Sequence, residues 1–132
     1  MGKSLMYAAL TNPAAVLAGG TIPLGEIIRR YGCGVNLNGN AVRLADPAYY
    51  GVHADVVVEA TAAGAIGATL LVDGAAYPGA IATDTAAAAG DAVTLPIDAI
   101  VRVGCCDGPK SLTLALSAEG TVTSVAVSVE RM

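Results

Sequence analysis

The sequence has no tryptophan and no phenylalanine among its 132 residues, and only five tyrosines supply aromatic rings. A hydrophobic core must therefore be filled by Val, Ile, Leu and Ala. Charged residues are also scarce, at 14% against about 25% in an average soluble domain, while hydrophobic residues reach 55%. Because so few charges cannot cover a monomer comfortably, we interpret the apolar surplus as subunit interface. The alternative is that Ala-rich runs such as 86–89 inflate the hydrophobic fraction without forming adhesive patches.

Basic residues are too few to predict a polyanionic partner. Seven Lys and Arg stand against eleven Asp and Glu, giving a net charge of -4, and the seven are scattered. Nucleic acids and anionic lipids attract clustered cations, so neither partner is expected. No apolar run approaches the ~20 residues that a membrane-spanning helix needs. The apolar stretch 5–10 is too short for a signal peptide, and we expect synthesis in the cytoplasm.

The three cysteines, Cys33, Cys105 and Cys106, do not form a recognisable disulfide or metal pattern. An odd number without a secretion signal favours free thiols. Adjacent cysteines also lack the C-x₂₋₄-C spacing that is typical of zinc sites. Pairing of Cys33 with one of the other two under oxidation stays open.

His53 is the only histidine. A nucleophile pair with Cys105 would require a loop thiol to reach a mid-strand imidazole, so a structural or interfacial role is favoured. Asp55 and Glu59 share a strand face with His53, but this set is too thin to predict a metal site on a symmetry axis. With no catalytic constellation, we predict no enzyme activity, no cofactor and no bound metal.

Residues 49–60 alternate between apolar and mixed side chains with a period of two, which predicts a long strand with one buried face. At about 3.3 Å per residue, it spans roughly 40 Å and belongs in the centre of a sheet. The expected inward set is Tyr50, Val52, Ala54, Val56, Val58 and Ala60. A second long strand is predicted over 92–103, with Val93, Leu95, Ile97, Ala99, Val101 and Val103 inward.

Turn signals separate the other predicted strands. Asn38-Gly39 and Asp73-Gly74 supply the positive φ angles of tight hairpins. Pro78-Gly79 indicates a bulge or a sheet edge. Residues 26–31 fit either a helical turn or a strand, and we favour a strand because two glycines follow closely. Residues 16–24 are expected to form an extended piece.

Three further features complete the secondary-structure prediction. The alanine run at 86–89 is too short to nucleate a helix and reads as a loop. Residues 104–109 are a loop by composition, in which Asp107 is expected to cap local backbone groups. The last strand ends close to Met132, which places it in a sheet centre. Eight to ten short strands without a convincing helix predict an all-β sandwich or barrel in one domain, 1–132.

The order and spacing of these strands resemble the compact ten-stranded jelly roll of the tumour-necrosis-factor and C1q superfamily. Tyr50 and Val52 stand at the Tyr and Phe positions of its Gly-x-Tyr-x-Phe signature, with Ala48 in place of the Gly. Gly90-Asp91 matches the Gly-Asp that precedes its sixth strand, and Ser124 matches a serine of its last strand. The opening segment 4–13, without a Gly-x-y stalk, most resembles the phage or prophage branch.

The resemblance implies a homotrimer in which the first, last, third and sixth strands surround a threefold axis. The outward residues would be Tyr49, Gly51, His53, Asp55, Val57, Thr94, Asp98, Ile100, Arg102, Ser124, Ala126, Ser128 and Glu130. Small residues among them would let subunits approach, and Asp55, Asp98 and Glu130 would pair with Arg102 or His53. The alternative is that this face is solvated and its charges are ordinary surface residues.

The implied function is that of a non-enzymatic accessory protein of a phage or prophage particle. Such a protein would decorate a capsid or form a head-fibre-like domain, docking on a shell protein or a host-surface ligand. The alternative is a trimeric receptor- or glycan-binding cap of a bacterial spore or cell-surface protein. A small thiol-dependent enzyme is a third class.

Overall fold

The computed structural model describes residues 4–106 and 108–132, which form strands and turns but no helix. No segment in these two ranges is a helix able to cross a membrane. The expected turn residue Asp107 lies outside the described residues. The strands within them are β1 (Leu5–Leu10), β2 (Ala14–Val16), β3 (Glu26–Tyr31), β4 (Val35–Asn38), β5 (Ala41–Leu44), β6 (Ala48–Ala60), β7 (Gly64–Val72), β8 (Ala75–Ala86), β9 (Ala92–Val103), β10 (Lys110–Leu116) and β11 (Gly120–Arg131).

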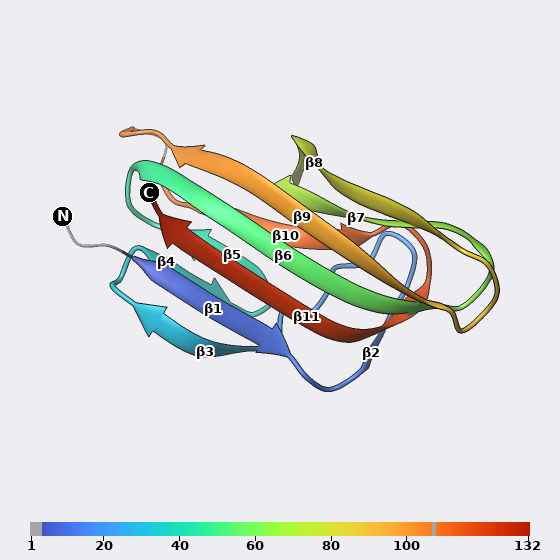
Figure 1. The fold of residues 1–132 in the computed structure, drawn as a ribbon. Coiled ribbons are helices and arrows are strands. Elements are labelled where there is room, and N and C mark those ends of the chain that lie inside the picture. The colour runs from blue at the N-terminus through green and yellow to red at the C-terminus, as the bar shows by residue number, and fades with distance from the viewer. Residues whose placement is uncertain (1–3, 107) are drawn as a thin grey trace.

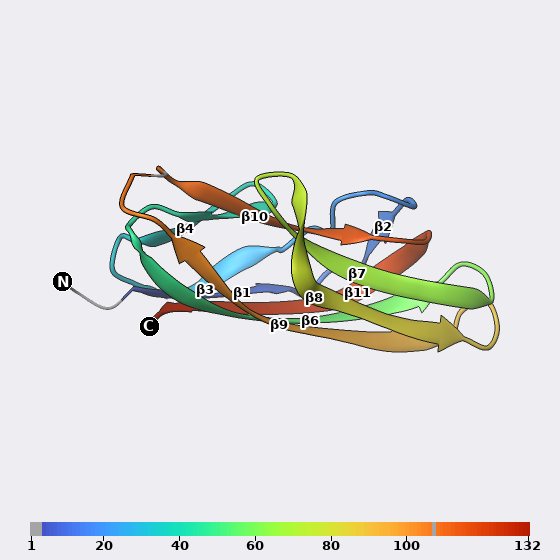
Figure 2. The ribbon, with the colours of Figure 1, turned by 90° about the horizontal axis from the view of Figure 1, so that it is seen from above.

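Two antiparallel sheets pack face to face in a jelly-roll β-sandwich (Figure 1). The six-stranded sheet has the order β3-β1-β11-β6-β9, with β2 also paired to β11, and the five-stranded sheet has the order β4-β5-β10-β7-β8. Figure 2 shows the two layers edge-on. The C-terminal β11 lies between β1 and β6, which confirms that the last strand is held in a sheet centre.

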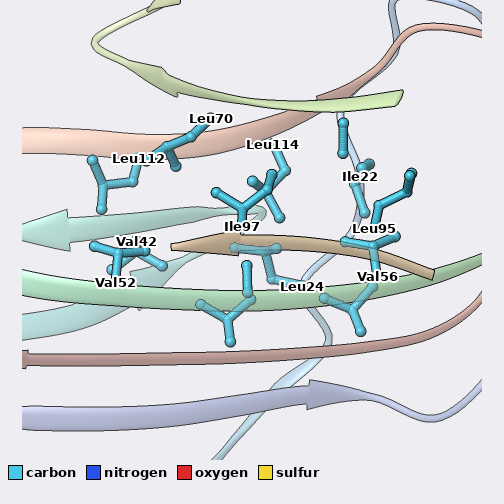
Figure 3. Packing of buried hydrophobic residues seen from close by; sticks show 14 of the residues in the cluster. Ile22, Leu24, Val42, Val52, Val56, Leu70, Leu95, Ile97, Leu112 and Leu114 are labelled. Atoms are coloured by element: carbon cyan, nitrogen blue, oxygen red, sulfur yellow. The ribbon is translucent and has the colours of Figure 1, made fainter. Parts of the chain in front are cut away.

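The alternation of β6 and β9 builds the core. All six predicted inward residues of β6 are buried, and so are those of β9 except Ala99, which is half-buried at its sheet's edge. Figure 3 shows Val56, Leu95 and Ile97 packing towards Leu70 and Leu114 of the opposite sheet. The predicted long strands are thus confirmed, β9 with the same bounds and β6 one residue longer.

The described residues form eleven strands, whereas the sequence predicted eight to ten. The second extended piece is also placed differently from the prediction for 16–24. Only Ala14–Val16 pairs with β11, and the chain then leaves the sheet. Gly19 and Gly25 both have φ of 78°, and Pro23 donates no backbone hydrogen bond, so a ladder cannot continue. Ile22 is nevertheless fully buried, and its N–H donates to the Leu114 carbonyl of β10 at 2.7 Å.

The turn after β4 is also one residue later than predicted. Its two central residues are Gly39, with φ of 62°, and Asn40, instead of Asn38 and Gly39. This register pairs Leu37 with Val42, whereas the predicted turn would have placed Leu37 opposite a polar asparagine. The apolar pair therefore decides the register.

The other turn predictions are confirmed. The turn after β7 is centred on Asp73 and Gly74, with φ of 52° and 85°. The segment 77–80 is both a bulge and an edge, because the β7–β8 register jumps there and β8 ends its sheet. Residues 26–31 form a strand. The loop predicted from residue 86 runs over 87–91, because Ala86 is the last residue of β8. That loop is closed by Asp91, whose Oδ2 accepts from the Ala88 N–H at 3.0 Å.

Tyr50 gives the fold a testable pH dependence. Its ring is fully buried, and its hydroxyl donates to the Asp46 carbonyl at 2.6 Å. Burial, and secondarily the charge of Asp46, raises the pKa of Tyr50 above 10.0. Since the unfolded tyrosine ionises first, this stabilisation is complete below pH 10.0 and is lost as the pH rises through the folded pKa.

We therefore expect Tyr50→Phe to flatten the alkaline decline in stability. At neutral pH the variant should lose about 1 kcal/mol, because the Asp46 carbonyl loses its donor. Urea unfolding midpoints measured between about pH 8 and pH 11 would check this. If the unfolding midpoints of the wild type and the variant fell in parallel across that range, Tyr50 would not be the source of the alkaline decline in stability.

Candidate functional site

The candidate site is the outer face of the six-stranded sheet, the side turned away from the core. Every outward residue predicted from the sequence lies there, because each neighbours buried residues on its own strand. Antiparallel partners point to the same side, so cross-strand pairing brings these residues together. The register places His53 beside Asp98 and Ser128, and Gly51 beside Ile100 and Glu130.

The charges of the outer face are only partly paired within one chain. His53 Nδ1 lies 2.5 Å from Asp98 Oδ1, which is one of the pairs expected from the sequence. Arg102 instead stacks on its cross-strand neighbour Tyr49, with its guanidinium carbon 5.9 Å from the ring centroid. Among the described residues, Asp55 and Glu130 form no ion pair. Two of the three expected acidic partners therefore remain available to another molecule.

An open groove of about 670 Å³ lies at the β9 side of this face. Gly51, Ile100 and Met132 provide its apolar floor, and His53, Asp98 and Glu130 add polar groups. The β8 bulge forms the remaining wall, through Tyr77, Pro78 and Gly79.

A hydrogen bond from Tyr77 joins the wall of the groove to β9. The Tyr77 hydroxyl donates to the Ile100 carbonyl at 2.5 Å. β8 and β9 belong to different sheets, so this bond joins the two layers at one edge of the sandwich. Sequence reasoning marked Pro78-Gly79 as a bulge, but nothing local indicated that it would flank His53 and Asp98.

Sequence reasoning missed the contribution of β1 to the outer face. Leu5 and Tyr7 point outward and are exposed, whereas Met6 and Ala8 between them are buried. β1 pairs with β11 along its whole length, so these side chains extend the face towards β3. The alternation within the first strand was a signal that could have found them.

The thiols and the imidazole do not meet. Cys105 and Cys106 follow β9, with their Sγ atoms 3.3 Å apart, and Cys33 follows β3 at the opposite edge of the sheet. None of the three is in a disulfide. His53 lies opposite Asp98, five residues before β9 ends, or roughly 16 Å along the strand. Within 4–106 and 108–132, no three His, Cys, Asp or Glu residues are grouped for metal binding.

Comparisons with known proteins bear on the fold. No protein-family model matches the sequence, and no curated sequence matches it significantly. Solved structures do match. Murine APRIL is similar with a TM-score of 0.76 and 11% identity over 99% of this chain and 100% of that chain. The globular domain of zebrafish complement 1qA gives 0.71 and 10% over 99% and 97%. Vertex protein P5 of the phage PRD1 gives 0.65 and 11% over 98% and 96%.

Proposed function

We propose that this chain, which has the jelly-roll fold of TNF-like and C1q domains, is a non-enzymatic structural protein that assembles as a homotrimer. In this proposal it is an accessory component of a phage or prophage particle, such as a capsid decoration or head-fibre-like domain. It would dock on a shell protein or present its loops to a host-surface ligand.

The observation that supports assembly is the apolar character of the outer face. Leu5, Tyr7, Tyr49 and Ile100 are large hydrophobic residues that are exposed on this one side of the sheet. Isolated exposed apolar residues are ordinary, but a group on one flat sheet face is typical of an interface. Small residues lie beside them on neighbouring strands: Gly51 is next to Ile100, and Ser128 is next to Tyr7. Ala126 follows in the next row along β11 and continues this small surface.

The particle context is supported by the likeness to PRD1 vertex protein P5, which spans nearly all of both chains. The alternative function, a receptor- or glycan-binding cap on a bacterial surface, is favoured by the open groove beside His53. The genes beside this one would separate the two. Capsid and packaging genes support the first function, and a collagen-like stalk gene supports the second.

The assembly proposal predicts the mass in solution and the effect of one substitution. Sedimentation at micromolar concentration should give three times the chain mass of 13.0 kDa. Ala126→Arg should weaken association at least about tenfold, because the long side chain needs space that the close approach of two copies does not leave. Ser111→Arg, on β10 of the other sheet, is the matched control and should remain trimeric. A wild-type protein that sediments as a monomer would overturn the proposal.

A further inference from the structure

We infer that neighbouring copies contact head to tail, with the β3 edge of one copy seated beside β9 of the next, so that Arg29 pairs with Asp98 across the interface. This inference rests on the threefold assembly proposed above. A second copy of this chain then occupies the groove beside β9.

Symmetry limits which surfaces can meet in such a trimer. A threefold axis relates each copy to the next by a rotation, so each contact joins two different patches. The edges of the six-stranded sheet are β3 and β9, as Figure 1 shows. Three such sheets facing one axis form the walls of a triangle, and the β9 edge of each copy then adjoins the β3 edge of the next. If the axis runs parallel to the strands, all residues of one cross-strand row lie at the same height along the axis. Rotation about the axis leaves that height unchanged.

One cross-strand row carries opposite charges at its two ends. Arg29 of β3 pairs with Tyr7 of β1, and Tyr7 pairs with Ser128 of β11. Ser128 pairs with His53 of β6, which in turn pairs with Asp98 of β9. Because rotation keeps this row at one height, Arg29 of one copy reaches Asp98 of the next.

The adjacent row carries apolar side chains at its ends. Tyr31 of β3 pairs with Leu5, and Leu5 pairs with Glu130. Glu130 pairs with Gly51, and Gly51 pairs with Ile100 of β9. Tyr31 is 63% exposed and Ile100 is 55% exposed. The same rotation brings these two together and would bury both.

The local surroundings of Arg29 and Asp98 suit such a pair. Arg29 is exposed and forms no ion pair with a described residue, whereas the neighbouring Arg30 donates from Nη1 to Asn36 Oδ1 at 3.1 Å. The Asp98 side chain is 73% exposed despite its contact with His53, so its carboxylate can accept further hydrogen bonds. A guanidinium is the cation best shaped to donate two of them to one carboxylate.

Charge reversal and charge swap test the pairing. We expect Arg29→Asp and Asp98→Arg each to raise the trimer dissociation constant at least about tenfold, since each places like charges together. The double variant Arg29→Asp/Asp98→Arg should return within about threefold of wild type, because the pair is restored with its polarity reversed. Arg43 is an exposed arginine on the other sheet, and Arg43→Asp is the control for the change in net charge that Arg29→Asp makes.

Association would be measured by sedimentation, with circular dichroism confirming that each variant is folded. The Arg29–Asp98 contact would be overturned if the single variants associated as strongly as the wild type, or if the double variant associated as weakly as the single variants. In either case a trimeric wild type would leave the assembly proposal standing. If the singles have no effect, the groove belongs to a different occupant. A monomeric wild type would instead remove the assembly on which the inference rests.

Discussion

Replacing Gly25 with alanine is expected to cost about 3–5 kcal/mol of stability, enough to unfold much of the protein. Two causes add at this position. Gly25 has φ of 78°, a conformation that side chains rarely adopt, and a Cβ there would overlap the Ala9 carbonyl oxygen. That oxygen belongs to the backbone of β1, which is held between β3 and β11 and cannot move aside.

Gly19→Ala is the matched control, because Gly19 has the same φ of 78° but no atom within 4 Å of the added Cβ. Its free energy of unfolding should fall by only about 1 kcal/mol, which is the cost of the strained backbone conformation alone. Urea unfolding followed by circular dichroism gives both values. Equal losses in the two variants would show that the close approach to β1 is not a constraint.

Ile97→Ala should cost about 2–5 kcal/mol, which is the second large effect. Ile97 is 2% exposed on β9 and lies between the sheets, where Figure 3 shows it beside the leucines of the opposite layer. The truncation removes apolar contacts and leaves a void that the two sheets cannot close without losing their register.

The control for this core truncation is Ile81→Ala, because Ile81 is 59% exposed on β8. We expect it to change stability by less than about 0.5 kcal/mol. Since assembly makes apparent stability depend on concentration, both variants and the wild type should be unfolded at one subunit concentration. A loss at Ile81 as large as that at Ile97 would contradict the placement of the core between the sheets.

The proposed contact also predicts how assembly responds to salt. Arg29 and Asp98 are exposed in the single chain and become partly shielded only when copies associate. Added salt screens charges that lie near the surface, so it should weaken wild-type association and have less effect on a variant without the pair. The apolar contact between Tyr31 and Ile100 does not depend on salt in this way, and it should persist.

Secondary structure could be predicted well because most of it follows from local alternation. In β6 and β9, apolar side chains recur at every second position over twelve or more residues, and only an extended strand places them on one face. The turn at Asp73-Gly74 was likewise readable, since few residues adopt its positive φ angles. Predictions were wrong where packing outweighed local preference, as at Asn38-Gly39, where the Leu37–Val42 pair moved the turn.

The sequence by itself determined which residues of each strand face the core, because the period of side chains along a strand is a local property. It therefore identified the outward set around His53 and the buried set around Val56. Only the tertiary structure decided which strands lie side by side. Arg29 and Asp98 share a row because β1 and β11, from opposite ends of the chain, pair in the middle of one sheet. Pairing between distant segments depends on burying both faces of a whole sandwich at once, and no local stretch of sequence carries that information.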